Sequence, residues 1–180
     1  MTQRYAGGCE HIHTHSNSEP LDSHTCHCSV CKSVTKQPST HVVIFNHSDF
    51  EIDNLESLNR QPFNVENPDG PLELCTCSTC RMPIMLDDKE QRIRAIVPNI
   101  MGYDPESMPA LYHAFFDPSA GAESPDDGRS IYAGMHPDFV MPESESDSTP
   151  QFDTEEATAD AAEEATADAA EEATADAAEE

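Results

Sequence analysis

Two short stretches decide how this chain folds: Cys26-His-Cys28-Ser-Val-Cys31 and Cys75-Thr-Cys77-Ser-Thr-Cys80. They share the pattern C-x-C-x-x-C and contain six of the seven cysteines of the 180-residue chain. Thiolates this close repel one another when ionised, and a divalent ion relieves that repulsion. Zinc takes four sulfur or nitrogen ligands in a tetrahedron. The repeated pattern therefore predicts metal binding.

The seventh cysteine stands in Cys9-Glu-His11, directly after Gly7-Gly8. On a strand, side chains two positions apart point the same way, so Cys9 and His11 could share one metal. The competing interpretation places His11 in an exposed polar run with His13 and His15.

Cys75 also has two interpretations. It is a buried small residue on the strand that leads into the second cysteine group. Alternatively, Cys75, Cys77 and Cys80 form a second three-thiolate site, and Cys9 and His11 are then unused.

The charge of the chain is strongly acidic and unevenly distributed. The chain has 35 acidic and 9 basic residues, and residues 143–180 carry 15 of the acids with no Lys or Arg. We therefore predict a domain over residues 4–142 and an acidic tail over 143–180, where an eight-residue repeat starts at Glu155. The tail is predicted to be disordered or marginally helical, and a protein partner could bind it. The acidity argues against nucleic acid, because phosphate contacts need clustered Lys and Arg.

The chain shows neither an apolar leader segment nor a run of about 18 apolar residues that would span a membrane. We expect no membrane partner and a cytoplasmic or nuclear location. Thiols stay reduced in those compartments, so the cysteines are better interpreted as metal ligands than as disulfides.

Short apolar or alternating runs separated by turn residues predict an all-β domain. We expect strands at 41–45, 50–52, 72–74, 83–86, 92–97 and 111–116. Residues 1–40 are expected to hold one or two strands, and 54–70 to be irregular surface. No helix of ten or more residues is expected before residue 142.

These motifs, in this order, resemble the glutathione-dependent formaldehyde-activating enzymes, also called centromere-protein-V-type domains. The resemblance covers roughly residues 5–140. It rests on Gly7-Gly-Cys9-Glu-His11, Cys26-His-Cys28-Ser-Val-Cys31, Cys77-Ser-Thr-Cys80-Arg-Met-Pro83, Leu111-Tyr-His113-Ala-Phe-Phe-Asp117 and Gly134-Met-His-Pro-Asp-Phe139.

The resemblance implies antiparallel sheets in an Mss4-like fold with two zinc ions. A structural zinc would be closed by Cys9, His11, Cys77 and Cys80. A second zinc would be held by Cys26, Cys28 and Cys31, with an open fourth position. Within these motifs, His11 stands where the family usually has Cys, and Ile12 where it commonly has Gly.

Three thiolates leave a zinc site with a net charge near −1, which suits a fourth sulfur ligand better than the activation of water. The family's activity implies addition of a thiol to a small aldehyde, a carbon–sulfur lyase reaction in its synthetic direction, with glutathione as co-substrate. Cys26, Cys28 and Cys31 would be the catalytic set. Non-catalytic alternatives are a zinc-binding interaction module, a glutathione carrier and a metal buffer.

Four other residues near the second cysteine group are candidates for the chemistry. Lys32 and Lys36 could hold the carboxylates of glutathione, or they are ordinary surface lysines. His24 and His27 could move protons, or they are exposed loop residues. His113 is expected to be a hydrogen-bonded sheet residue rather than a ligand.

Overall fold

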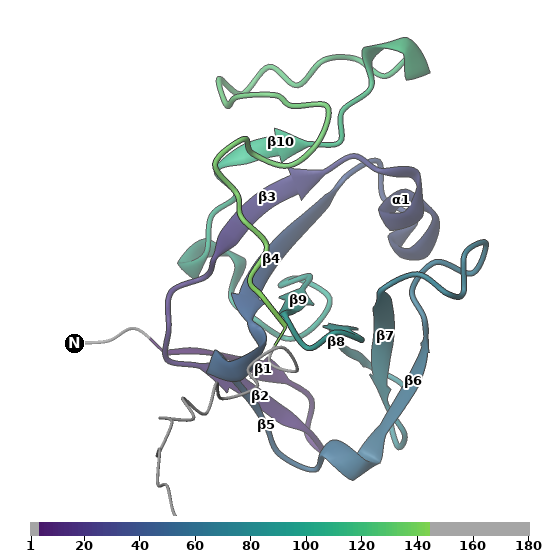
Figure 1. The fold of residues 1–180 in the computed structure, drawn as a ribbon, viewed down its shortest axis with the longest axis vertical. Helices are drawn as coiled ribbons and strands as arrows, with labels where there is room; N and C mark the ends of the chain where they lie inside the picture. The colour runs from purple at the N-terminus through teal and green to yellow at the C-terminus, as the bar shows by residue number, and fades with distance from the viewer. Residues whose placement is uncertain (1–3, 145–180) are drawn as a thin grey trace, which may run out of the picture. The chain divides into compact units, whose positions relative to one another are not determined.

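The computed structural model describes residues 4–144, which form two β-sheets and one short helix (Figure 1). A three-stranded sheet has the order β1-β2-β5, and a seven-stranded sheet has the order β10-β3-β4-β9-β8-β7-β6. All strand pairs are antiparallel except β10 with β3. The predicted all-β class with antiparallel sheets is confirmed. Of the predicted tail at 143–180, all but the first two residues lie outside the described part.

The elements have the following bounds. The first sheet contains β1 (Tyr5–Gly8), β2 (His13–Ser16) and β5 (Phe50–Ile52). The second contains β3 (Asp22–Cys26), β4 (Thr40–Asn46), β6 (Leu58–Pro62), β7 (Leu72–Cys77), β8 (Pro83–Asp88), β9 (Ile93–Ile96) and β10 (Tyr112–Ala114). The α-helix α1 spans Ser29–Thr35, and four 3-10 turns occupy His47–Asp49, Leu55–Ser57, Pro105–Ser107 and Pro118–Ala120.

All six predicted strands are present, five of them with shifted ends, but two other expectations are wrong. Residues 54–70 are not wholly irregular, because they contain β6 at the edge of the larger sheet. The side chains of β6 are mostly exposed, so no apolar alternation marks it in the sequence. The segment before residue 40 holds three strands and α1, more than the predicted one or two strands.

An aromatic cluster joins the two sheets. The Phe45 ring of β4 lies between Tyr5 of β1, with centroids 5.7 Å apart, and Phe50 of β5, at 5.5 Å. All three side chains are buried. Aromatic pairs at these separations stabilise a core beyond the area they bury.

The helix α1 is held at both ends. Its N-cap is Cys28, whose sulfur accepts a hydrogen bond from the Cys31 amide at 3.3 Å. Lys36 ends it in the left-handed region at φ 58°, where its amide bonds the Lys32 carbonyl. At seven residues α1 is too short to show a helical period, which is why the sequence did not reveal it. No helix in residues 4–144 is long and apolar enough to cross a membrane.

Strand register fixes which side chains of the larger sheet share a face. Ile44 of β4 pairs with Asp22 of β3 on one side and with Ala95 of β9 on the other, and Ala95 pairs with Leu86 of β8. His24 pairs with Val42. Because side chains alternate along a strand, these residues line the same face as Cys26.

Gly7 is required by a close approach between β1 and the segment after β9. A Cβ at this position would overlap the ring of Tyr103, which is itself buried. The next residue, Gly8, has φ +103°, and its amide donates to the Met101 carbonyl at 2.9 Å.

We predict that Gly7→Ala lowers the free energy of unfolding by about 1–3 kcal/mol, because the added methyl group overpacks the Tyr103 ring. Gly134→Ala is the matched control, since a Cβ there meets no atom within 4 Å. Urea unfolding followed by circular dichroism measures both variants. Equal stability of the two would contradict the packing described here.

Candidate functional site

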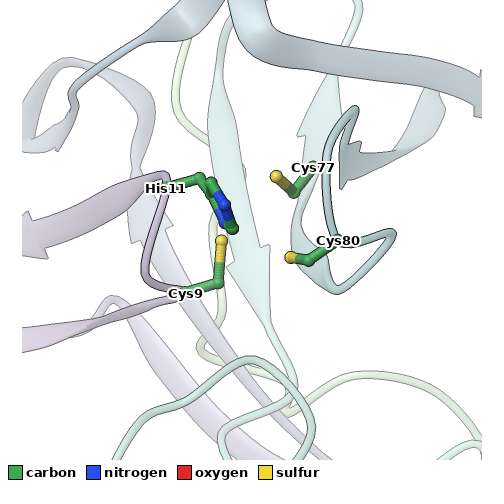
Figure 2. Close-up of side chains that lie close together, drawn as sticks. All are labelled: Cys9, His11, Cys77 and Cys80. Carbon is green, nitrogen blue, oxygen red and sulfur yellow. The ribbon is translucent and has the colours of Figure 1, made fainter.

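Four side chains from two distant turns form the first cluster (Figure 2). Cys9 and His11 come from the turn between β1 and β2, and Cys77 and Cys80 from the end of β7 and the turn before β8. One ligand atom from each lies within 4.8 Å of all the others. Tetrahedral Zn–S bonds of about 2.3 Å place sulfurs about 3.8 Å apart, so this donor set fits a zinc ion.

Backbone hydrogen bonds shape both turns. The Cys9 amide donates to the Ile12 carbonyl at 2.8 Å, and the Cys77 amide donates to the Met82 carbonyl at 2.9 Å. Cys9 and His11 therefore lie in a tight turn, and the prediction that they share a strand is wrong. The N–H of Cys80 stabilises the Cys77 thiolate and lowers the pKa of Cys77 to about 7.

A small apolar cluster lies beneath these ligands. Ile12, Cys77 and Ile84 are fully buried together, and Cys9 packs against them. Ile12 thus anchors the β1–β2 turn to Ile84 of β8. His13 and His15 lie on β2, outside this group of ligands.

The second cluster contains Cys26, Cys28 and Cys31, whose sulfurs also lie within 4.8 Å of one another. Cys26 ends β3, Cys28 caps α1, and Cys31 lies in the first turn of that helix. Cys26 and Cys31 are buried and Cys28 is half-buried. A strand end and a helix start, only two residues apart, bring the three sulfurs to one point.

Hydrogen bonds among these thiols set their pKa values. The thiols of Cys26 and then Cys31 donate to the Cys28 sulfur, which holds the pKa of Cys28 well below that of a free thiol. The bond to Cys28 raises the pKa of Cys26 to about 11. The pKa of Cys31 is raised as well, by its bonds with Cys26 and then Cys28. Without metal, the cluster therefore holds one thiolate and two thiols near neutral pH.

Cys75 lies apart from both clusters. It is fully buried in β7, and burial raises the pKa of its thiol to about 11. The structure supports the first interpretation, a buried strand residue, and not the second, since Cys77 and Cys80 converge with Cys9 and His11.

A series of hydrogen-bonded side chains holds His27, the residue between Cys26 and Cys28. His27 Nε2 lies 3.0 Å from His113 Nδ1, and His113 Nε2 lies 3.0 Å from Asp127. Arg129 donates to Asp127 at 2.9 Å, and Arg129 and then His113 lower the pKa of that carboxyl group. Because a carboxylate only accepts, His113 donates to Asp127 and accepts from His27. Burial lowers the pKa of His27.

His113 is thus a buried, hydrogen-bonded residue of β10, as predicted. Asp127 and Arg129 were not predicted, because only the fold brings their loop to β10. His24, predicted to be exposed if it had no role, is buried in β3.

A cavity of ≈ 360 Å³ adjoins the second cluster. All three cysteines of that cluster line it, together with His24, Asn64 and Asn67. Its other walls are mostly apolar and include Val42, Ile44, Leu86, Ala95, Phe63 and Phe139. Within residues 4–144, no Lys, Arg, Asp or Glu lines this cavity, so Lys32 (half-buried) and Lys36 (exposed) lie outside it.

A model of the glutathione-dependent formaldehyde-activating enzyme family matches residues 4–117, more than half of the chain. The chain belongs to this family. Both cysteine clusters, including His11, lie within the matched residues.

Comparison with solved structures finds a Rhodobacter sphaeroides protein at 17% sequence identity and a TM-score of 0.43. The match covers 61% of this chain and 99% of the other. Comparison with curated proteins finds no match.

We predict that Cys28 is alkylated by iodoacetamide faster than Cys26 and Cys31 when metal-free protein is treated at pH 6. This order of alkylation rates follows from the pKa shifts. Cys28, with a lowered pKa, keeps its thiolate as the pH falls, whereas Cys26, with a pKa of about 11, stays protonated. Peptide mass spectrometry measures the labelling of each residue. Equal labelling of the three cysteines would contradict the hydrogen-bond pattern of the cluster.

Proposed function

We propose that this domain binds two zinc ions. A structural ion is closed by Cys9, His11, Cys77 and Cys80, four donors of the kind found in Cys₃His sites. A second ion is held by Cys26, Cys28 and Cys31, which provide three protein ligands, the number typical of catalytic zinc. The support is the convergence of each donor set within 4.8 Å.

We propose that the second site activates a thiol for addition to a small aldehyde, the reaction of a carbon–sulfur lyase in its synthetic direction. The thiol is glutathione, and the simplest aldehyde is formaldehyde. Zinc bound there would offer a fourth position to the thiol and lower its pKa. The observation that carries the proposal is the three-cysteine cluster on a cavity wall, in a chain of this family.

The chain's own residues have separate tasks in this reaction. The cysteines would hold the zinc ion that binds the reacting sulfur at one end of the cavity, and the apolar walls keep water away from that end. Lys32 on α1 and Lys36 at its C-cap, both outside the cavity, attract the carboxylates of glutathione. The thiolate sulfur attacks the carbonyl carbon, a C–S bond forms, the C=O π electrons move to oxygen, and oxygen takes a proton. The product is a hydroxymethyl thioether.

The test is to measure zinc per chain on purified protein, then the rate of S-hydroxymethylglutathione formation above the uncatalysed rate. We expect two zinc ions, one of them perturbed by glutathione, and an added rate that Cys28→Ser abolishes. Cys75→Ser is the matched control, because Cys75 lies outside both clusters. Zinc without glutathione sensitivity or added rate would favour the non-catalytic binding module.

We predict that the two clusters differ in their contribution to stability. Cys77→Ala should unfold the domain, because binding of a structural zinc is part of the folding free energy. Cys28→Ala should lose one zinc and keep its fold, since α1 and β3 are also held by the sheet. Circular dichroism, a thermal melt and the zinc content measure both variants. A stable Cys77→Ala variant, or an unfolded Cys28→Ala variant, would contradict the division into structural and reactive sites.

A further inference from the structure

We infer that the aldehyde used by this site carries an apolar chain of several carbons, which lies in the cavity beside Cys26, Cys28 and Cys31, and that the hydroxyl group of its thiol adduct donates a hydrogen bond to His24. This inference rests on the proposed function and names its substrate class. It depends on three features of the described residues: the size of the cavity, the character of its walls and the one buried imidazole that faces into it.

The cavity is far larger than formaldehyde needs. Formaldehyde has no carbon chain, yet ≈ 360 Å³ of space continues from the thiols along β4, β8 and β9. Ala95, at the centre of that face, has only a methyl group, and its paired neighbours Ile44 and Leu86 form the wall on either side. The space is therefore built into the sheet and is shaped for a ligand larger than one carbon.

The walls exclude the body of glutathione. Its two carboxylates and one ammonium group would be buried without a charged partner, at a high cost in free energy. Lys32 of α1 and Lys36 just after it, both outside the cavity, can meet those carboxylates instead. The thiol can thus reach the cluster while the peptide stays outside. The apolar space is left for the other reactant, the aldehyde.

His24 supplies a polar contact in this apolar space. Its Nδ1 lies 2.6 Å from Asp22, whose other carboxylate oxygen accepts from Tyr112 at 2.9 Å. Since the carboxylate accepts, Nδ1 carries a proton, and in the neutral imidazole Nε2 then presents a lone pair.

The His24 Nε2 atom opens onto the cavity. The structure gives it no hydrogen-bond partner among residues 4–144, although every fully buried side-chain nitrogen or oxygen in that part of the chain has one. His24 is only 2% exposed, and it lines this cavity. Nε2 is therefore placed to accept a hydrogen bond from a ligand.

The adduct of the thiol and the aldehyde fits the cavity and forms without a change of oxidation state. The thiolate attacks the carbonyl carbon, the π electrons move to oxygen, and the proton lost by the thiol ends on that oxygen. The product carries a hydroxyl group, whose hydrogen His24 Nε2 accepts, and an apolar chain, which packs against Val42 and Ile44.

The first experiment measures binding without reaction. Straight-chain alcohols from ethanol to 1-hexanol have the hydroxyl and the chain but no carbonyl, and their binding to zinc-loaded full-length protein is measured by saturation-transfer NMR. We expect the dissociation constant to fall about 3–4-fold for each added methylene until the cavity is full. Equal binding of ethanol and 1-hexanol overturns the inference.

Two variants separate the chain contact from the hydroxyl contact. Ala95→Leu should weaken only the longer alcohols, because it fills the cavity beneath the chain. His24→Asn should weaken every alcohol by a similar factor, about 3–10-fold, and leave the gain per methylene unchanged. Val34→Leu, on α1 but outside the cavity wall, is the matched control. If Ala95→Leu does not fold, the alcohol series on the unaltered protein still tests whether the cavity binds an apolar chain.

The reaction itself distinguishes failure of this inference from failure of the proposed function. With glutathione, kcat/KM should rise from formaldehyde to butanal and hexanal. Catalysis that favours formaldehyde overturns the inference and leaves the proposed function intact. Chain-dependent alcohol binding with no catalysis removes the proposed function and the aldehyde, and shows an apolar ligand site. A rate that rises with the chain of the thiol, tested with 1-hexanethiol and formaldehyde, overturns the assignment to the aldehyde.

Discussion

The two sheets depend on the contact between the β1–β2 turn and the β7–β8 turn. Three fully buried residues, Ile12, Cys77 and Ile84, form a small apolar cluster at this contact, and Cys9, Ile52 and Leu58 pack against it. His11 and Cys80 beside it are exposed, so burial alone contributes little there. A metal ion joining four ligands across the contact would supply the free energy that so small a cluster lacks. The aromatic contacts of Phe45 hold the same two sheets from the other end of β1.

The two faces of the larger sheet have different surroundings. Val43 and Phe45 of β4 are fully buried in the core, whereas Val42 and Ile44 line the cavity. Alternation along β3 places His24 on the cavity face two residues before Cys26. One sheet thus fixes the positions of Cys26, the imidazole and the apolar wall relative to one another, and α1 with its N-cap adds the thiols of Cys31 and Cys28. Rigid strands hold such a group of side chains more accurately than loops would.

The sequence predicted what depends on local spacing and missed what depends on long-range packing. The β-branched run at 41–45 was sufficient to predict the central strand, and the cysteine spacings indicated metal binding. The grouping of Cys9 and His11 with Cys77 and Cys80 came from the resemblance to the family, because the spacing of Cys9 and His11 also fits an exposed polar run. Asp127 reaches His113 through a loop whose path no local pattern encodes. The cavity is formed by Phe63 and Phe139, which lie far from the cysteines in sequence and meet only in the fold.

The two C-x-C-x-x-C stretches show that a spacing specifies a site only together with the element that carries it. In Cys26–Cys31 the strand ends at the first cysteine and the helix begins after the second, so all three sulfurs converge. In Cys75–Cys80 the strand continues through the second cysteine, and a register shift after Cys75 separates the first cysteine from the ligands. Cys75 is then buried opposite Met85, the residue of β8 with which it pairs. Two ligand positions remain for Cys9 and His11 of the N-terminal turn. A strand boundary two residues earlier or later therefore decides whether the same pattern makes an open three-thiol cluster or half of a four-ligand one.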